Sequence, residues 1–405
     1  MEKNIESNQK ISLVLLVCLV GFPQISETIY TPSLTEISQS YSISLNLAQM
    51  TLSIYFLAFA FGVFFWGIAS DFIGRRKAMN FGIFIYILGS IVCFTSNHIS
   101  ILFIGRFIQA FGASTGSVTT QTILRDHYHG NERHVLFSKI SAALAFSPAI
   151  GPLIGGFIGQ YAGFRFVFLS LVIMGMILFF WSLNSLPETK STQSIELSTH
   201  SIVAIGKEML FDRYTFAFGG LIGIFNGILF SYQSEAPSIF IEQFHFSQSQ
   251  YGFTGCLVAS ATILGAVLSN QLLKRKSPKL IIRNGIQLAL IGSLLLCLFS
   301  LVAVSVHVQI IIYLVSIFII LTGIGLALPN CLSLALVNFS EVAGTAGAFL
   351  SLGYYMIVSI CTFLISVFHT GSIVVFPLFC IGLLIIGYWF TKFITENRLN
   401  ERAVN

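Results

Sequence analysis

Long apolar stretches, separated by short polar breaks, recur along the whole chain. Most are close to the length of about 20 residues that crosses a bilayer as a helix, and they lack the alternation of a membrane-barrel strand. The pattern predicts an all-α integral membrane protein with twelve transmembrane helices. The expected spans are 11–33, 47–69, 77–96, 99–121, 136–160, 164–184, 213–235, 250–273, 281–304, 308–332, 345–368 and 371–393.

The longest polar stretch, 185–212, falls halfway along the chain and contains one short amphipathic segment. It predicts a six-helix bundle at 1–184, a cytoplasmic linker at 185–212 and a second six-helix bundle at 213–405. The halves resemble each other faintly, since PSLTEISQSYSIS at 32–44 corresponds to PSIFIEQFHFSQS at 237–249. Duplicated bundles that meet at a central site are common in secondary transporters, so we expect two pseudo-symmetric bundles.

Composition and charge support this interpretation. Hydrophobic residues make up 55% of the chain and charged residues 9%, whereas soluble domains have about 25% charged residues. If the N-terminus is cytoplasmic, all but two of the 21 Lys and Arg residues lie on that side; the exceptions are Arg106 and Arg165. The positive-inside rule then places both termini in the cytoplasm. We expect the protein in a bacterial inner membrane. Basic residues confined to short loops argue against nucleic-acid binding.

The loop after the second helix reads GIASDFIGRRKAMNFG, residues 67–82. Two glycines permit close helix approach and a tight turn, and an acid at a helix end can meet a basic side chain or a helix N-terminus. This order of residues resembles the loop motif of the major facilitator superfamily, although Phe72 replaces a usual basic residue. The resemblance implies a latch that holds the cytoplasmic side shut in the outward-facing state. The predicted gating residues are Gly67, Asp71, Gly74, Arg75, Arg76, Arg125 and Asp126, of which the last two, at the end of the fourth helix, are expected to pair with this loop.

Arg106 is a cation inside the fourth predicted helix. Such a residue costs about 2.5–3.5 kcal/mol at a helix centre on insertion scales, so a partner or a water-filled cavity is expected. The alternative is that its side chain reaches the outer interface. The segment resembles the superfamily's R-x-x-Q-G motif, which includes Gln109 and implies a role of Arg106 in proton coupling.

The fifth helix contains SPAIGPLIGGFIG at 147–159. Its prolines remove backbone donors and bend the helix, while its glycines allow tight packing. Gly151, Pro152, Gly155 and Gly156 form G-P-x-x-G-G, which resembles the antiporter motif of exporter branches of the superfamily. This resemblance favours export over import.

Glu27 lies in SETIYTPSL, about 24 Å along the first helix at 1.5 Å per residue. A carboxyl group there could take a proton from one side and release it to the other as access alternates; alternatively, it lies at the outer interface. The segment resembles the first helix of the Bcr/CflA drug-resistance transporters, whose pattern is D-x-Y-x-P. Thr28 occupies the place of the Asp, so Glu27 is a hypothetical substitute for the proton site.

Aromatic and polar residues of several helices form the expected substrate pocket, which suits amphipathic or cationic compounds. The predicted pocket residues are Tyr30, Gln109, Asn226, Tyr232, Glu235 and Tyr354. Glu235 could equally be a simple interface residue.

The sequence thus predicts a proton-coupled efflux antiporter for small amphipathic drugs of the multidrug, chloramphenicol or bicyclomycin type, acting by alternating access. An alternative is a permease or exporter for one metabolite, such as an amino acid, sugar or siderophore. No enzymatic activity, metal site or cofactor is expected, and the proton gradient is the energy source. The expected partners are the lipid bilayer, protons and a small-molecule substrate, with the chain acting as a monomer.

Overall fold

A computed structural model describes residues 11–128, 130–190, 199–302 and 305–395. Within these residues the chain forms twelve helices that are long and apolar enough to cross a membrane, which confirms the predicted all-α membrane fold. The helices of the first half are α1 (Leu13–Thr28), α2 (Leu34–Ser40), α3 (Leu45–Ile73), α4 (Arg75–Thr95), α5 (Ile99–His127), α6 (Gly130–Leu144), α7 (Ser147–Ala162) and α8 (Phe164–Ser185). Those of the second half are α10 (Arg213–Pro237), α11 (Gln248–Leu272), α12 (Pro278–Ser300), α13 (Val306–Leu334), α14 (Ala343–Phe368) and α15 (Val375–Thr395).

Shorter helices join or extend these spans. The segment η2 (Thr31–Ser33) links α1 to α2, η3 (Ser238–Gln243) extends α10, and η4 (Val337–Val342) precedes α14. The polar stretch between the halves carries α9 (Thr199–Phe211), where the amphipathic segment was expected.

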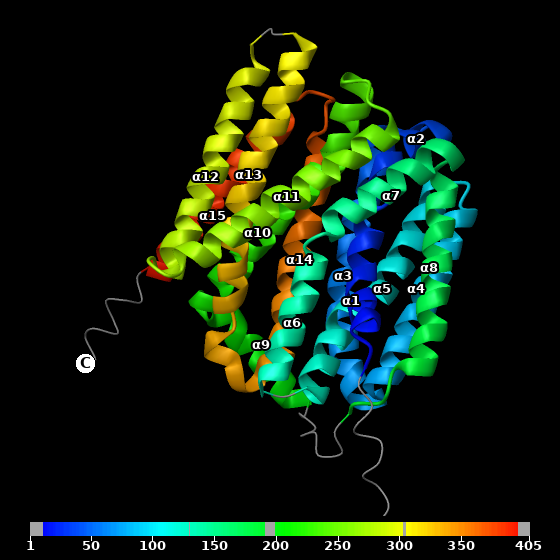
Figure 1. The fold of residues 1–405 in the computed structure, drawn as a ribbon, viewed down its shortest axis with the longest axis vertical. Helices are drawn as coiled ribbons and strands as arrows, with labels where there is room; N and C mark the ends of the chain where they lie inside the picture. The colour runs from blue at the N-terminus through cyan, green and yellow to red at the C-terminus, as the bar shows by residue number, and fades with distance from the viewer. Residues whose placement is uncertain (1–10, 129, 191–198, 303–304, 396–405) are drawn as a thin grey trace, which may run out of the picture.

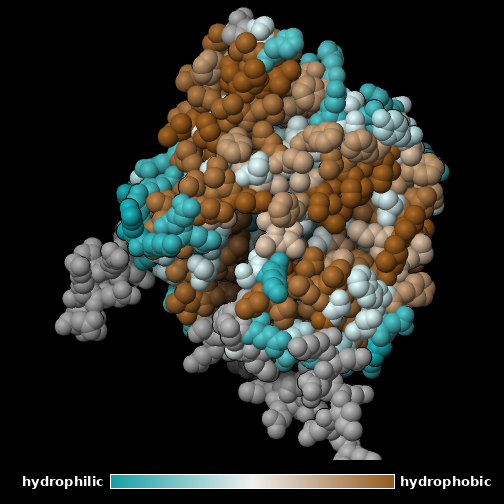
Figure 2. Space-filling view, in the orientation of Figure 1, coloured by the Kyte–Doolittle hydropathy of each residue, from teal (hydrophilic) through white to brown (hydrophobic). Residues whose placement is uncertain are grey.

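Most buried apolar side chains belong to two large clusters. One is formed almost entirely by α1–α8 and the other by α10–α15. In Figure 1 the blue-to-green helices of the first half lie beside the green-to-red helices of the second half. Apolar side chains also cover the outer sides of the helices, and polar residues gather towards their ends (Figure 2). This distribution is what a lipid environment requires of a helical bundle.

Two of the predicted spans are interrupted. The first was expected to be continuous over 11–33, but α1 ends at Thr28 and the chain continues through η2 and α2. Pro32 lacks the N–H that would donate to residue 28 of a continuing helix, which explains the break. The fifth span is divided at Ala145–Phe146, directly before Pro148, into α6 and α7.

Other boundaries differ by several residues. The fourth span extends to His127 instead of residue 121, and α3 runs to Ile73 instead of residue 69. Both extensions contain charged residues, at which the search for apolar stretches ended the predicted spans. They carry Asp71, Arg125 and Asp126 on helical backbone.

The two halves meet along two helix pairs, α3 with α14 and α7 with α11. In the second pair the backbones approach closely: a Cβ added to Gly156 would meet the carbonyl oxygen of Gln248, and one added to Gly252 would meet that of Pro152. Small residues at these positions allow the contact.

Candidate functional site

A cavity of about 820 Å³ lies between the two halves, and residues of α3, α5, α6, α13 and α14 line it. Its wall includes Gly67, Asp71 and Arg75 at the end of α3 and the start of α4, so the cavity lies at the end of the molecule where this loop is found. Ser117, Gln121, Ser351 and Tyr354 contribute polar groups to its wall.

The opposite end is closed by polar contacts between the halves. Asn46 of α3 donates from Nδ2 to the carbonyl oxygens of Ser366 and His369 at 2.9 and 3.0 Å. Gln248 of α11 donates to Glu36 of α2 at 3.1 Å, and Ser249 N donates to the side chain of Gln160 at 3.0 Å. We call this the sealed end.

Arg106 is fully buried, so it does not reach an interface. Its guanidinium lies 4.0 Å from the ring centre of Tyr30 and 4.1 Å from that of Tyr55. Its Nη1 donates to Oε1 of Gln109 at 2.5 Å and, more weakly, to the carbonyl oxygen of Ser26 at 3.4 Å. Two aromatic faces and an amide therefore provide the partner that the sequence demanded for this cation.

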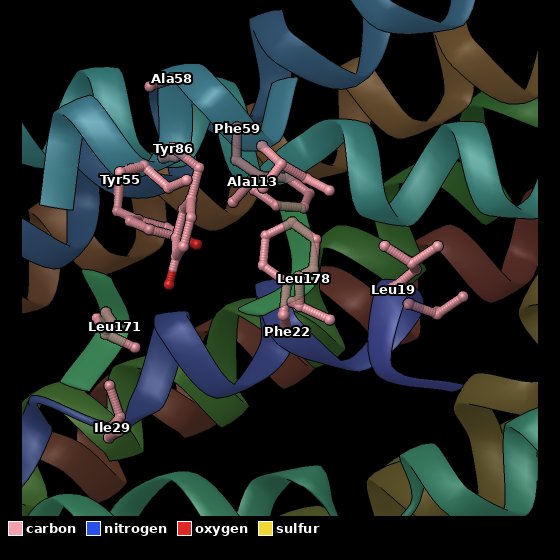
Figure 3. Packing of buried hydrophobic residues seen from close by; sticks show 14 of the residues in the cluster. Leu19, Phe22, Ile29, Tyr55, Ala58, Phe59, Tyr86, Ala113, Leu171 and Leu178 are labelled. Carbon is pink, nitrogen blue, oxygen red and sulfur yellow. The ribbon is translucent and has the colours of Figure 1, made fainter. Parts of the chain in front are cut away.

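The shell around Arg106 includes residues that the sequence analysis missed. Gln109 donates from Nε2 to Ser90 Oγ at 2.8 Å, and the hydroxyls of Ser26 and Tyr86 lie 2.7 Å apart. Figure 3 shows Tyr55 and Tyr86 above α1, with their hydroxyl groups directed towards it. In the sequence, Tyr55 and Tyr86 differ from their surroundings only as hydroxyl-bearing aromatic residues in Phe-rich helices.

Glu27 is also buried, with 4% of its surface exposed, which excludes an interface position. Its Oε1 has no hydrogen-bond partner among the described residues. The carboxyl group acts electrostatically on Tyr55, Tyr354 and Tyr355, and Arg106 acts on it in turn. Tyr354 also lines the cavity, whereas Glu27 is not one of the residues of its wall.

Thr28, the residue after Glu27, faces α7. Thr28 lies against Gly151 of α7, where an added Cβ would meet its Oγ1, and a Cβ on Gly155 would meet the carbonyl oxygen of Ile29. The G-P-x-x-G-G segment therefore packs against the end of α1 on one side and, through Gly156, against α11 on the other. A step of one residue turns a helix by about 100°, so positions 27 and 28 point in different directions.

A three-residue ion-pair cluster joins the ends of α3 and α5 to the start of α4. Arg75 binds Asp71 and Asp126, each at 2.8 Å, and donates from Nη1 to the carbonyl oxygen of Ser70. Asp126 thus pairs with this loop as expected, whereas Arg125 forms no ion pair among the described residues. Gly74 has φ +94°, a conformation that glycine adopts freely.

Glu188, which follows α8, is a further partner that the sequence analysis did not identify. Its carboxylate accepts the backbone N–H groups of Arg75 at 2.8 Å and Arg76 at 3.3 Å, the first two residues of α4. Arg76 in turn donates to the carbonyl oxygen of Leu183 at 2.6 Å. The start of α4 is therefore held by the end of α8.

The predicted pocket residues do not form one group in this structure. Tyr354 lines the cavity, whereas Tyr30 and Gln109 surround Arg106. Asn226 donates to the carbonyl oxygen of Ile222 in its own helix. Tyr232 and Glu235 are buried nearer the sealed end.

Glu235 forms an ion pair with His369, a residue that the sequence analysis did not select. Both carboxylate oxygens lie 2.9 Å from Nδ1 of His369, and Gln49 donates to Oε1 of Glu235 at 3.1 Å. Burial disfavours the charged imidazole, but the hydrogen bond and negative charge of Glu235 outweigh burial and raise the pKa of His369. A buried pair excludes the reading of Glu235 as a simple interface residue.

A comparison with protein families decides the assignment. Residues 16–360 match the family model described as Major Facilitator Superfamily. The chain belongs to this superfamily. It is therefore a secondary transporter and not an enzyme, as expected, and its described residues form twelve helices long and apolar enough to cross a membrane.

Individual proteins similar to this chain are named as transporters or as a resistance protein. A protein named as an uncharacterized transporter of Rickettsia felis is 34% identical over 377 residues, which cover 92% of this chain and 93% of that one. The chloramphenicol resistance protein of Pseudomonas aeruginosa is 25% identical over 364 residues, covering 87% and 83% of the two chains. Among solved structures, a D-xylose–proton symporter superposes with a TM-score of 0.73 at 16% identity, over 94% of this transporter and 98% of that chain. This last likeness concerns the fold alone.

Proposed function

We propose that the transporter is a proton-coupled efflux antiporter for small amphipathic drugs. The observation that carries this proposal is the buried carboxyl group of Glu27, on which the buried Arg106 acts electrostatically, in a molecule with a cavity at one end and polar contacts that seal the other. A carboxyl group in such a place can exchange its proton with whichever side the interior faces. The resemblance to the Bcr/CflA transporters and the similarity to a chloramphenicol resistance protein support the substrate class.

In this proposal the halves alternate access to one central site. A proton from the outer side binds Glu27, the sealed end closes, and the proton leaves through the cavity to the cytoplasm while the substrate takes the opposite path. Each proton contributes about 2.3 kcal/mol per 100 mV of membrane potential. We assign coupling to Glu27 and Arg106, and substrate contacts to Tyr30, Gln109, Asn226, Tyr232, Glu235 and Tyr354.

The loop cluster would control the cytoplasmic end. Asp71, Arg75 and Asp126 lie at the mouth of the cavity, where Gly67 approaches Ala348 of α14. We propose that closing the cavity brings Asp71 to the start of α14, and that Arg76 and Arg125 support this gate. The orientation, with both termini and the loop in the cytoplasm, the two-bundle division at 184 and 213, and the monomeric state are parts of the same proposal.

A transport assay tests the proposal directly. Everted membrane vesicles would be energised so that their interior becomes acidic, and proton release would be followed by a pH-sensitive dye after addition of a phenicol, bicyclomycin or a lipophilic cation. We expect release with wild type and its loss in Glu27→Gln. Glu208→Gln, which changes an exposed acid of α9, is the matched control and should behave as wild type.

Two other results would redirect the assignment. Release in both wild type and Glu27→Gln would place the proton site elsewhere. No response to any drug in wild type would reject the drug-antiporter proposal.

One observation favours the second candidate, a carrier for a single metabolite. Arg125 and Arg133 line the cavity, while both acids in its wall are occupied by Arg75. This excess of positive charge suits an anionic metabolite. A response to one organic acid, with silence from all drugs, would favour this candidate.

A further inference from the structure

A buried cluster of titratable and amide side chains lies at the sealed end, away from Glu27 and Arg106. It comprises Glu235 of α10, His369 at the end of α14 and Gln49 of α3. The side chains of Glu235 and His369 are 1% and 7% exposed. Because the carboxylate faces Nδ1 of His369 through both oxygens, this ring nitrogen carries a hydrogen.

Both halves of the molecule complete this site. From the first half, Gln49 donates to Oε1 of Glu235 at 3.1 Å and to the carbonyl oxygen of Ser234 at 3.0 Å. Asn46, one turn earlier on α3, donates from Nδ2 to the backbone carbonyl oxygen of His369. Opening of the sealed end would therefore remove the α3 side of the site and admit water to the pair.

We propose that Glu235 and His369 form a proton-binding lock, which takes up a proton when the two halves close at the sealed end. The lock shares Glu235 with the proposed substrate contacts, whereas His369 and Gln49 lie outside that set. Its ligand is a proton, and α3 supplies the amides that complete it.

The surrounding charges determine the direction of the effect. Glu235 and Glu242, from α10 and η3, both act on His369, and Tyr313 of α13 faces Glu235. The α3 residues that touch the pair, Asn46 and Gln49, are uncharged amides. The negative groups therefore favour the protonated imidazole in the closed arrangement.

The dependence on pH follows from linkage. The closed site has a raised pKa for His369, whereas an opened, hydrated site would have a pKa nearer the usual 6.5. The closed arrangement therefore gains stability below the open-state pKa, and this contribution is lost as the pH rises through the raised value. Low pH should favour closure of the sealed end.

A distance measurement tests this proposal in the full-length protein. In a cysteine-free background, spin labels would be placed at Ser44→Cys before α3 and Ser372→Cys after α14, two exposed positions on opposite halves. Pulsed EPR in nanodiscs from about pH 5 to pH 9 would report the fraction of molecules closed at the sealed end. We expect this fraction to fall with rising pH in wild type, with a midpoint above 6.5.

Variants separate the lock from other proton sites. In His369→Gln the closed fraction should no longer change with pH. In Glu235→Gln this change should be lost or its midpoint should fall. His369→Asn is a second variant in case His369→Gln does not elute as a folded protein. His98→Gln, which changes an exposed histidine at the same end, should keep the wild-type curve.

Two results would overturn the lock. They are a wild-type distance that does not change with pH, and a wild-type response retained in His369→Gln. Failure of the drug assay in vesicles would leave these distances unaffected, so the two proposals can fail independently.

Discussion

Arg75 donates a hydrogen bond from Nε to Oδ2 of Asp126 at 2.8 Å, and the same guanidinium binds Asp71 at 2.8 Å. One side chain therefore connects the end of α3, the start of α4 and the end of α5. Arg75 is buried, and the side chain of Asp126 is 25% exposed, so water screens this contact less than it would a surface pair.

Asp126→Asn should destabilise the transporter by about 1–3 kcal/mol, since the charge-assisted hydrogen bond of Arg75 is weakened. Thermal unfolding in detergent measures this change. Arg165→Gln, which removes an exposed bond to Asn97, is the control and should lower the melting temperature less. Equal shifts for the two variants would show that the cluster does not stabilise the loop.

Glu188→Gln should loosen the start of α4. The carboxylate accepts two backbone N–H groups at the positive end of this helix, an arrangement worth about 0.5–2 kcal/mol. Hydrogen exchange at Arg75 and Arg76, followed by mass spectrometry, should become faster. Unchanged exchange would mean that other groups replace the cap.

Gly155→Ala should abolish transport while the protein still inserts into the membrane. Its Cβ would meet the carbonyl oxygen of Ile29, a backbone atom that cannot move away without shifting α1. Gly353→Ala is the matched control, because a Cβ at that position meets no atom within 4 Å. Substrate uptake by everted vesicles and membrane abundance would be measured together; a transport-competent Gly155→Ala would contradict the tight α1–α7 contact.

Arg106→Lys should reduce transport more than tenfold despite keeping the charge. A lysine ammonium cannot lie flat between Tyr30 and Tyr55 while donating to Gln109, as the planar guanidinium does. Tyr55→Phe, which keeps the ring face, should retain most activity. Wild-type rates in Arg106→Lys would show that charge alone is sufficient.

Helix periodicity and loop charge predicted the architecture well, since a bilayer requires long apolar helices and permits few other patterns. The same logic fails at helix ends. The break after Thr28 depends on Pro32, and α5 ends in the polar residues 125–127, which a hydropathy pattern assigns to a loop.

The candidate sites were predicted in part. Arg106 and Glu27 could be selected because charges are rare and costly within membrane helices. Their neighbours Tyr55 and Tyr355 could not be selected, since the chain has many other aromatic residues. His369, the partner of Glu235, could not be selected either, since it lies 134 positions away. Such pairs arise from tertiary packing between spans, for which one sequence carries no signal.

The one-residue offset between Glu27 and Thr28 has a consequence for comparing sequences. An alignment that requires an acid at position 28 counts this chain as lacking one. A buried carboxyl group is nevertheless present one residue earlier, at Glu27, while Thr28 contacts Gly151. To decide whether a relative has a buried acid on its first helix, the location of the carboxyl group in the structure is therefore a better criterion than its position in an alignment.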